Sequence, residues 1–553
     1  MRTGRAGVDI TVWTDLRHVI AMALLVSLTG CLRAADTVRF DLDPENEEQT
    51  TATIRVTSAP VTIDFDISNA GTKFNPGVRG LALNDEPISR AAFSVAIRDC
   101  VNLSDNSSLR GVAGGLFADL FDWRTRNHEA RPPTLEFLRW ARDHNAELYI
   151  TANARGLIDR KNEQGKGIYY TSDTETLANL AADWVRYCNR IVQTYREGDV
   201  IEDAEDRRIM DRLIWSSHVP GDQFTTLLRA GETTTPKVRY WEIGNEPSVS
   251  TSGSINVLNG YRTSPYDFYE KYKAIALAMK AADPTIKVGP CIVNAQERRE
   301  GKHLALILGD HSVPVDFIAY HPYQRMGDKK KSAADIETYL ENVYFYHKRE
   351  FKLEQDTVTS SGRDASKMEY AATEWFVSYW SYNETETEGQ MAHMLGSVET
   401  VFSFARLGLS AAHYWIWIAN NTDGTSYPVT LAWNAMRNHM GDELMKTVRE
   451  PGLRGYVTRD SKTSEVAVWA MNFSNEVDRA LTIELPEGTT TASAQLLCAK
   501  SGKTTLFSAN VAPHTPGGPK NEVAWKPLEL PALPDRRVKV VLPAATLLLV
   551  TCR

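Results

Sequence analysis

The chain has 553 residues, more than one ordinary domain needs, so one large domain with a smaller one is expected. Hydrophobic residues make up 42% and charged residues 24%, which is typical of a globular protein and excludes a disordered or fibrous one. The formal net charge of −8 argues against a nucleic-acid-binding surface, because such a surface requires clustered basic side chains.

The first 35 residues have the pattern of an export signal. A basic pair precedes the apolar run Val19–Leu28, which is too short to span a bilayer. The run ends in Leu-Thr-Gly followed by Cys31, similar to the lipobox of bacterial lipoproteins, in which the cysteine is acylated. Acylation of Cys31 would attach the protein to a membrane, ordinary cleavage a few residues later would release it, and a buried helix is the third interpretation. Export to the periplasm, the outer membrane or the medium is expected in the first two cases.

Short strand-like runs alternate with helical patterns from about residue 76 to about residue 440. The expected strands are Gly80–Leu83, Leu109–Val112, Glu147–Ala152, Val238–Ile243, Lys287–Pro290, Asp316–Tyr320, Glu369–Thr373 and Ala411–Trp417. The expected helices are Pro133–His144, Thr174–Tyr195, Tyr266–Ala282 and Gln390–Leu407. This alternation predicts an α/β fold, a (β/α)8 TIM barrel over 76–440. A doubly wound open sheet is the competitor, but it usually has a glycine-rich turn after its first strand, where this chain has Asn84-Asp85-Glu86.

The predicted barrel is long for its fold, and the excess is expected in two loops. One is 196–236, which is charged and then rich in serine and threonine. The other is Met326–Met368, which contains the run Lys329-Lys330-Lys331. We expect the lysine run to belong to a solvated loop.

Two regions consist of strand patterns alone. After about residue 446 the runs are GYVTRD, EVAVWAMNF, RALTIELP, SAQLLCA and VKVVLPAATLLLV, separated by turn residues. They predict a C-terminal β-sandwich over 446–553. Residues 36–75 alternate in the same way and are expected to join this sandwich.

Titratable side chains follow several of the predicted barrel strands. Glu246 comes at the end of the stretch YWEIGNEP, and Glu374 ends EYAATEW. His321 and Tyr323 follow the sixth strand, and the ends of all strands meet at one rim of a barrel. Two carboxylates that face each other are what glycosidic bond cleavage needs, one protonated to donate and one ionised to attack. Like charges in proximity separate their pKa values and so assign the two roles.

The stretch 241–247, Trp-Glu-Ile-Gly-Asn-Glu-Pro, together with Thr-Glu-Trp at 373–375, resembles the clan-A retaining glycoside hydrolases. The resemblance implies that Glu246 is the acid/base, that Glu374 is the nucleophile and that Asn245 binds the 2-hydroxyl of the sugar. It also implies that Tyr323 hydrogen-bonds Glu374 and that His321 lines the sugar pocket. The α-L-arabinofuranosidase and β-xylosidase families are most similar, since they share the Glu-Ile-Gly-Asn-Glu style of motif, an Asp-Phe-Ile-x-x-His-x-Tyr strand and an appended β-sandwich.

Five further residues are candidates for substrate binding. Those families often have Arg-x-Pro-Gly-Gly near the second strand; this chain has Arg110-Gly-Val-Ala-Gly-Gly, so Arg110 is expected to contact substrate although it stands one residue early. Asn153 at the end of the third strand either contacts substrate or caps the next helix. Trp415 and Trp417 are two apart in the eighth strand, and at most one of them is expected to stack on sugar. Trp375, beside Glu374, is the alternative.

The sequence therefore predicts an exported retaining glycoside hydrolase that acts on plant- or microbe-derived polysaccharide or oligosaccharide. The chemistry needs no cofactor and no metal, and the six cysteines show no CxxC or Cys/His spacing of a zinc site. A non-catalytic carbohydrate-binding surface protein is the alternative from another class. A glucuronidase, a galactosidase or an endo-glycanase stays open as the specificity, whereas an esterase would need a Gly-x-Ser-x-Gly motif that the sequence lacks.

Overall fold

The computed structural model describes residues 61–63, 71–82, 108–111, 122–124, 134–159, 168–170, 173–213, 225–248, 263–296, 300–324, 332–377, 389–415, 426–511, 520–530 and 536–553. The predicted export signal with Cys31, the strands expected over 36–60 and Trp417 lie outside these residues. None of the helices in the described ranges is long and apolar enough to cross a membrane.

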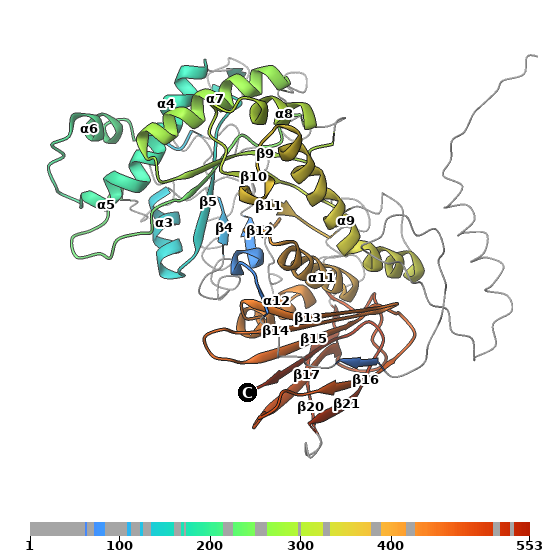
Figure 1. The fold of residues 1–553 in the computed structure, drawn as a ribbon. Helices are drawn as coiled ribbons and strands as arrows, with labels where there is room; N and C mark the ends of the chain where they lie inside the picture. Colours follow the sequence, from blue (N-terminus) through green and yellow to red (C-terminus); the bar gives the residue numbers. More distant parts are fainter. Residues whose placement is uncertain are drawn as a thin grey trace, which may run out of the picture. The chain divides into compact units, whose positions relative to one another are not determined.

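Eight parallel strands close into a barrel (Figure 1). They are β3 (Gly80–Ala82), β4 (Ser108–Arg110), β5 (Glu147–Ala152), β8 (Tyr240–Ile243), β9 (Lys287–Ile292), β10 (Phe317–Tyr320), β11 (Glu369–Trp375) and β12 (Ala411–Tyr414). Each strand pairs with the next in chain order, and β12 pairs with β3 to complete the ring. The strands read as continuous apolar runs because both of their faces are buried. The barrel predicted from the sequence is confirmed, and the open sheet is excluded.

From β4 onward, helices in the described residues connect successive barrel strands and cover the outside of the barrel (Figure 1). They are α3 (Thr134–Asp143), α4 (Thr174–Arg186), which continues through a π-helical turn (Tyr187–Ile191) into α5 (Val192–Thr194), α7 (Pro265–Ala282), α8 (Gly301–Gly309), α9 (Ala333–Ser360), α11 (Met391–Leu407) and α12 (Pro428–His439). Short 3-10 turns lie at Pro76–Arg79 and Ala365–Lys367, and a small hairpin joins β6 (Leu157–Asp159) to β7 (Ile168–Tyr170).

The prediction that Met326–Met368 is a loop is wrong, because most of this segment forms α9. A capping box starts the helix: the Ser332 hydroxyl and the Asp335 carboxylate each accept a backbone N–H of the other residue. One face of α9 is buried along its length, through Ile336, Leu340 and Val343 among others. The 196–236 segment is also not wholly a loop, since it contains the short helix α6 (Ala204–Met210).

The barrel interior beneath the rim is filled with aromatic side chains. The rings of Tyr149 and Tyr240 stack with centroids 4.4 Å apart, and Phe317 meets both of them edge-on. His413 of β12 packs against Tyr149 of β5 across the barrel interior, with ring centroids 4.8 Å apart. These side chains form a solid floor, so any substrate must approach from the rim at the strand ends.

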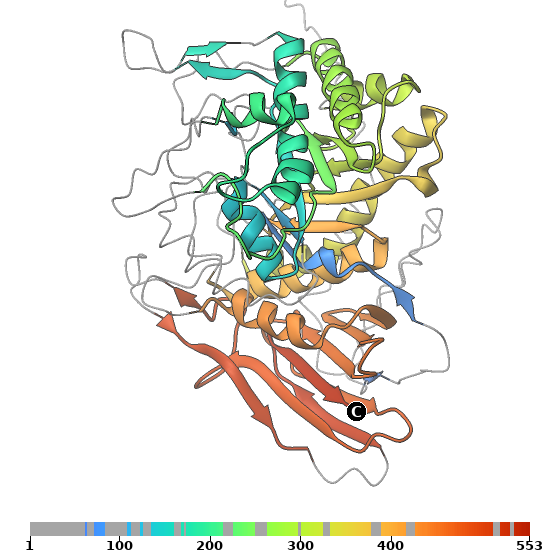
Figure 2. The same ribbon diagram turned by 90° about the vertical axis from the view of Figure 1, so that its left-hand side faces the viewer.

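The C-terminal region is a sandwich of two sheets, shown by the orange and red arrows of Figure 2. The larger sheet has the order β2 (Thr72–Lys73), β13 (Glu443–Glu450), β14 (Leu453–Arg459), β15 (Val466–Asn472), β22 (Leu547–Cys552), β17 (Ala492–Ala499) and β20 (Val523–Leu528). The smaller sheet contains β1 (Val61–Ile63), β16 (Arg479–Glu484) and β21 (Arg537–Leu542). A short ladder pairs β18 (Asn510–Val511) with β19 (Lys520–Asn521).

The strands β1 and β2 show how the N-terminal part of the described chain joins the sandwich. Val61–Ile63 runs parallel to β16 in the smaller sheet, and Thr72–Lys73 runs antiparallel to β13 in the larger one. The run VKVVLPAATLLLV, read as one strand in the sequence, divides into β21 and β22, which belong to different sheets. A turn with Ala545 at a φ of +53° separates them.

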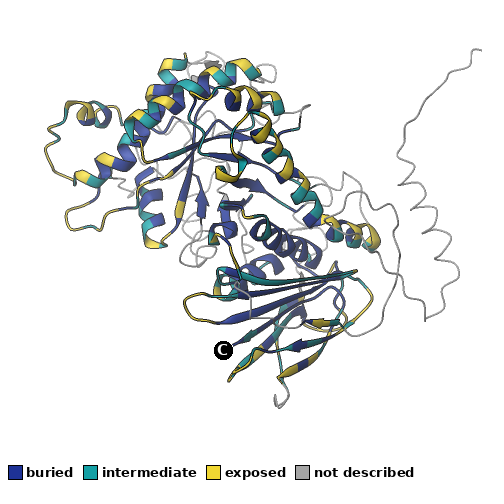
Figure 3. Cartoon of the chain, viewed as in Figure 1, coloured by how far each residue is buried: buried dark blue, intermediate teal, exposed yellow. Residues whose placement is uncertain are grey.

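The helix α11 packs against both the barrel and the sandwich. Its residues are buried on every side from Met391 to Ala405 (Figure 3). The Phe402 ring stacks on Tyr456 of β14 with centroids 4.1 Å apart. The barrel and the sandwich therefore share a continuous apolar contact, and α11 holds the ends of β11 and β12 in place from outside.

Candidate active site

The chain leaves regular strand geometry between β8 and Glu246. Gly244 has a φ of +76°, and a Cβ there would lie 2.6 Å from the Phe268 ring, so both conformation and space require glycine. Glu246 has a φ of +47°, a left-handed conformation that costs a residue with a side chain roughly 1–2 kcal/mol. The Glu246 N–H donates to the carbonyl of Cys291 at 3.2 Å, and Arg155 donates to the Glu246 carbonyl at 3.2 Å. A fixed backbone therefore directs the Glu246 side chain.

Strand β11 carries a bulge at Glu374. Its register against β12 slips between Ala372 and Trp375. Thr373, whose hydroxyl lies 3.9 Å from the Cys291 sulfur, and Glu374 both face the barrel interior. A bulge lets two consecutive side chains point to the same side and turns the next one away. The bulge is what brings Glu374 into the barrel.

Trp375 consequently lies outside the barrel wall. It is 0% exposed and packs against Phe404, Tyr414 and Trp433, with ring centroids 5.0–6.0 Å away. The prediction that Trp375 stacks on sugar is therefore contradicted. The bulge places Trp375 in the layer between barrel and helices, where it is a core residue.

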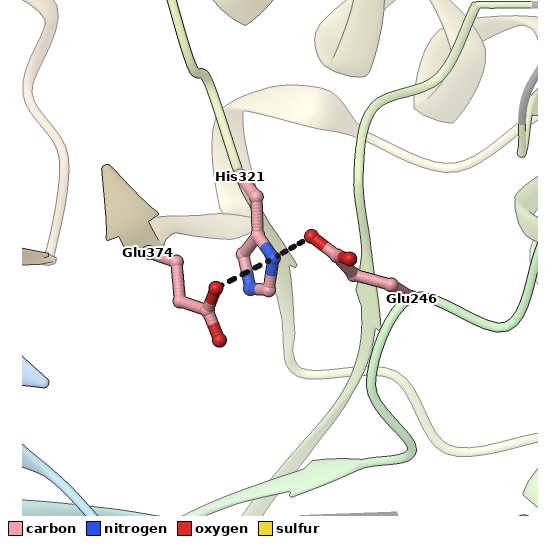
Figure 4. A group of neighbouring side chains, drawn as sticks. All are labelled: Glu246, His321 and Glu374. Carbon is pink, nitrogen blue, oxygen red and sulfur yellow. Dashed lines mark hydrogen bonds and ion pairs between the residues drawn. The ribbon is translucent and has the colours of Figure 1, made fainter. Parts of the chain in front are cut away.

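Glu246 and Glu374 meet across His321 (Figure 4). The Nδ1 atom of His321 lies 2.6 Å from Oε1 of Glu246 and 3.6 Å from Oε2 of Glu374. One oxygen of each carboxylate and a ring nitrogen of His321 all lie within 4.8 Å of one another. The strand ends thus bring together the two carboxylates and the histidine that the sequence singled out.

Arg110, expected to contact substrate, lies beneath the carboxylates instead. It is 0% exposed. Its Nε donates to Glu242 at 2.8 Å, one terminal nitrogen to Glu374 at 2.5 Å and the other to Oδ1 of Asn245 at 2.7 Å. Each guanidinium nitrogen therefore has a protein partner, and the expectation of a substrate contact is corrected to a positioning role.

Tyr323 and Trp415 form one wall beside Glu374. The Tyr323 hydroxyl donates to Oε2 of Glu374 at 2.8 Å, the contact that the resemblance implied. The Trp415 ring meets Tyr323 edge-on with centroids 6.1 Å apart. Trp415 is half-buried, unlike Trp375, and of these two tryptophans it is the one that contacts Tyr323.

The side chain of Asn153 is occupied by its own loop. Its carbonyl oxygen accepts the N–H groups of Arg155 and Gly156 at 3.0 Å each, and its amide donates to the Gly156 carbonyl at 2.7 Å. These bonds shape the turn that places Arg155 under the Glu246 backbone. Of the two roles considered for Asn153, the structure gives it the local one, although it caps a turn and not a helix.

The surroundings set distinct protonation states for the site residues. Burial raises the pKa of Glu374, but His321 and Arg110 outweigh it and hold the pKa below the usual 4.5. Burial lowers the pKa of His321, whereas the Cys291 sulfur and the two glutamates raise it well above 6.5. Burial and the two glutamates raise the pKa of Tyr323, so its hydroxyl stays protonated and can donate. These directions favour an ionised Glu374 carboxylate and a protonated His321 ring.

Sequence reasoning missed two residues that complete the site. Cys291 lies on β9 with its sulfur 3.2 Å from Nε2 of His321, and burial raises the pKa of its thiol to about 11. Arg155 holds the Glu246 backbone. Side chains alternate along β9, and this alternation places Cys291 inside the barrel, so it could have been predicted from the sequence. Arg155 lies in a loop, where no such pattern exists.

A metal ion would compete with existing contacts at this site. Glu246, His321 and Glu374 are the group in the described chain whose ligand atoms lie close enough to hold one. Both ring nitrogens of His321 already face protein partners, Glu246 on one side and Cys291 on the other. The expectation of no metal stays a prediction.

The barrel with its appended β-sandwich is similar in fold to solved structures of glycoside hydrolases. No family model matches the sequence, and no curated protein matches it. Solved structures, in contrast, match its fold. An α-L-arabinofuranosidase from Thermotoga maritima in complex with arabinose has a TM-score of 0.60 at 16% identity, over 89% of this chain and 99% of that one. A family 51 α-L-arabinofuranosidase from Bifidobacterium longum has a TM-score of 0.61 at 16% identity, over 90% and 100%. A family 44 endoglucanase from Clostridium thermocellum has a TM-score of 0.55 at 12% identity, over 90% and 100%. At such identities the likeness establishes the fold.

Proposed function

We propose that this protein is a retaining glycoside hydrolase, with Glu374 as nucleophile and Glu246 as acid/base. The observation that carries the proposal is that one carboxylate oxygen of Glu246 and one of Glu374 lie within 4.8 Å of each other at the ends of β8 and β11. Retaining enzymes keep their carboxyl groups about 5–5.5 Å apart, whereas inverting enzymes leave about 6.5–9.5 Å for a water molecule.

The reaction would proceed in two displacements. Glu246, protonated, gives its proton to the glycosidic oxygen while an oxygen of Glu374 attacks the anomeric carbon, so the alcohol leaves and an ester to Glu374 forms. Glu246, now ionised, takes a proton from water; the water oxygen attacks the same carbon and the ester bond breaks. The low pKa of Glu374 supports the nucleophile role, since an attacking carboxylate must be ionised.

Asn245 supports the same assignment. Arg110 can only donate, so the Asn245 atom that faces it is the carbonyl oxygen. The Asn245 amide nitrogen is buried without a protein partner. It is free to donate to a sugar hydroxyl, and a buried donor of this kind gains most when substrate satisfies it.

For the sugar, we propose an α-L-arabinofuranoside or a β-xyloside, on the motif resemblance and on the fold shared with arabinofuranosidases. The endoglucanase neighbours keep an endo-acting glycanase as the second candidate. A panel of nitrophenyl glycosides and of soluble xylan, arabinan and glucan would separate these specificities.

The catalytic assignment is tested by two variants. Glu374→Ala should abolish turnover, and Glu246→Ala should lose activity that added azide restores as glycosyl azide of retained configuration. Near-parental activity of both variants would refute the assignment. A parent protein that binds the sugars without cleaving any of them would favour the non-catalytic alternative.

For the location, we propose export, with Cys31 acylated. The support is the sequence pattern described above. Metabolic labelling with a radioactive fatty acid should mark the parent but not a Cys31→Ser variant; equal labelling of the two would contradict acylation at this residue.

A further inference from the structure

Glu300 is a fully buried carboxylate that no step of the proposed reaction uses. It is 0% exposed and is the N-cap residue of α8, but its side chain makes no capping hydrogen bond to that helix. Its Oε1 accepts the N–H of Ser248 at 2.7 Å, and its Oε2 accepts the N–H of Val293 at 2.5 Å. One side chain thus joins the loop that follows β8 to the segment that follows β9.

The first of these segments contains Glu246, the proposed acid/base, and the second is bonded to the backbone of His321, which contacts it. Ser248 is two residues beyond Glu246 in the chain. The carbonyl of Val293 accepts the backbone N–H of His321 at 2.9 Å, and His321 contacts Glu246 at 2.6 Å. Glu300 therefore lies at the junction between the backbone of Glu246 and the backbone of its histidine partner.

The backbone conformation of Glu246 has to be maintained by contacts such as those that Glu300 makes. A left-handed φ of +47° is unfavourable for a glutamate, so neighbouring contacts must maintain it. The Glu246 N–H is tied to β9 on one side through Cys291, and Ser248 is tied to the β9 end on the other through Glu300. Loss of the second tie would let the loop relax and move the Glu246 carboxylate.

Retaining a buried carboxylate here is costly. Burial and the nearby charge of Glu246 raise the pKa of Glu300 to about 7. A glutamate so disfavoured is hard to explain as a packing residue, because an apolar side chain would fill the same space without this cost. Its two backbone contacts are the compensating gain.

We propose that Glu300 is a positioning residue, which fixes the loop after β8 against the end of β9 so that the Glu246 carboxylate is held at His321 and at the leaving oxygen. The inference rests on the acid/base role proposed for Glu246. Glu300 lies outside the site and would control protonation of the leaving group, but not the attack by Glu374.

Leaving-group dependence tests the proposal. A dinitrophenyl glycoside leaves with little help from an acid, whereas an unsubstituted phenyl glycoside needs a proton. Misplacement of the acid should therefore lower kcat/KM of Glu300→Ala on the phenyl glycoside by about 100-fold and leave the dinitrophenyl glycoside nearly unchanged. Glu300→Gln keeps one acceptor oxygen and should show a smaller loss of the same kind, which also covers the case in which the alanine variant fails to fold.

Glu354→Gln is the matched control. Glu354 is 0% exposed and accepts a backbone N–H of Ala295 at 2.7 Å, on the same segment after β9, but it does not reach the loop of Glu246. It should change both substrates equally or not at all. Equal losses on both substrates in Glu300→Ala and Glu300→Gln would overturn the proposal.

A crystal structure of Glu300→Gln or Glu300→Ala gives a readout that does not depend on activity. We expect the Glu246 carboxylate to leave its position 2.6 Å from His321. If it stays within about 0.5 Å of that position, Glu300 does not position it. A parent protein inactive on every glycoside would refute the proposed hydrolase, and the structure of the variant would still decide the positioning role.

Discussion

Replacing Arg110 by methionine removes the cation that lies between two buried carboxylates. Arg110 is 0% exposed and bonds Glu242 at 2.8 Å and Glu374 at 2.5 Å. Methionine keeps the volume of the aliphatic stem but leaves Glu242 and Glu374 without this counter-charge. Breaking a buried ion pair in this way typically costs about 3–5 kcal/mol of folding free energy. Urea unfolding of Arg110→Met at neutral pH should show a loss of that size.

The same change should move the pH dependence of activity. Arg110 is one of the two cations that lower the pKa of Glu374, and an adjacent opposite charge is worth roughly 1–3 pH units. The acidic limb of kcat/KM, which reports ionisation of the nucleophile, should shift upward by about that amount in the variant.

The stability loss should depend on pH with a defined sign. The pKa of Glu374 is lower in the folded protein than its usual 4.5, so its contribution to stability is present above that value and is lost as the pH falls through the folded pKa. The difference between parent and Arg110→Met should therefore be largest near neutral pH and should shrink in acid.

Arg454→Met is the control for a buried arginine elsewhere. Arg454 is 2% exposed and pairs with Glu341 and Glu399 where α9 and α11 meet the sandwich. Its loss should destabilise the fold without shifting the acidic limb. An unchanged acidic limb in Arg110→Met, with the enzyme still folded, would refute the electrostatic reasoning.

Three further outcomes follow from the structure. Trp375→Ala should cost about 3–5 kcal/mol in urea unfolding with KM of the folded enzyme unchanged, because Trp375 fills the core; a large KM effect with parental stability would contradict this. Tyr323→Phe should lower kcat by roughly 10-fold or more, since it removes a donor to an ionised carboxylate, and parental kcat would exclude that role. Burial raises the pKa of Glu354 from 4.5 to about 8, so the parent loses the stability contributed by the protonated carboxyl group as the pH rises from 5 to 9. Glu354→Gln cannot lose it and should gain up to roughly 4 kcal/mol of stability relative to the parent over that range. Thermal melts at pH 5 and pH 9 would detect the difference.

The barrel could be predicted because its strands are buried on both faces. Apolar runs such as Phe317–Tyr320 and Ala411–Tyr414 are unmistakable in the sequence, and their alternation with helices fixes the topology. The sequence analysis missed helix α9 because charged residues obscure the spacing of its apolar residues. Its 28 residues have a wide exposed face rich in charge, and the preceding lysine run suggested a solvated loop. The capping box at Ser332 was the local signal that could have revealed it.

The candidate site could be predicted as a set of strand ends, but not as a set of orientations. Arg110 stands in a three-residue strand, and its partners Glu242, Asn245 and Glu374 come from two other strands. Sequence spacing carries no information on such a contact, because only closure of the barrel creates it. A buried arginine is stable only where these partners converge, so its role could be seen only in the folded chain.

Both proposed catalytic glutamates lie where the strand rule of alternating sides fails. Glu246 follows a left-handed turn at Gly244, and Glu374 lies in the bulge of β11. Strict alternation from Ala371 would send Glu374 outward and Trp375 inward, the reverse of what is found. The wrong prediction for Trp375 and the prediction that Glu374 belongs to the site thus have one origin. The sequence motif identified the strand end, and the bulge determines which side chain enters the barrel. A left-handed backbone and a β-bulge both cost energy. Their presence at the two carboxylates, while β8 itself stays regular, is an argument that this rim is the functional face.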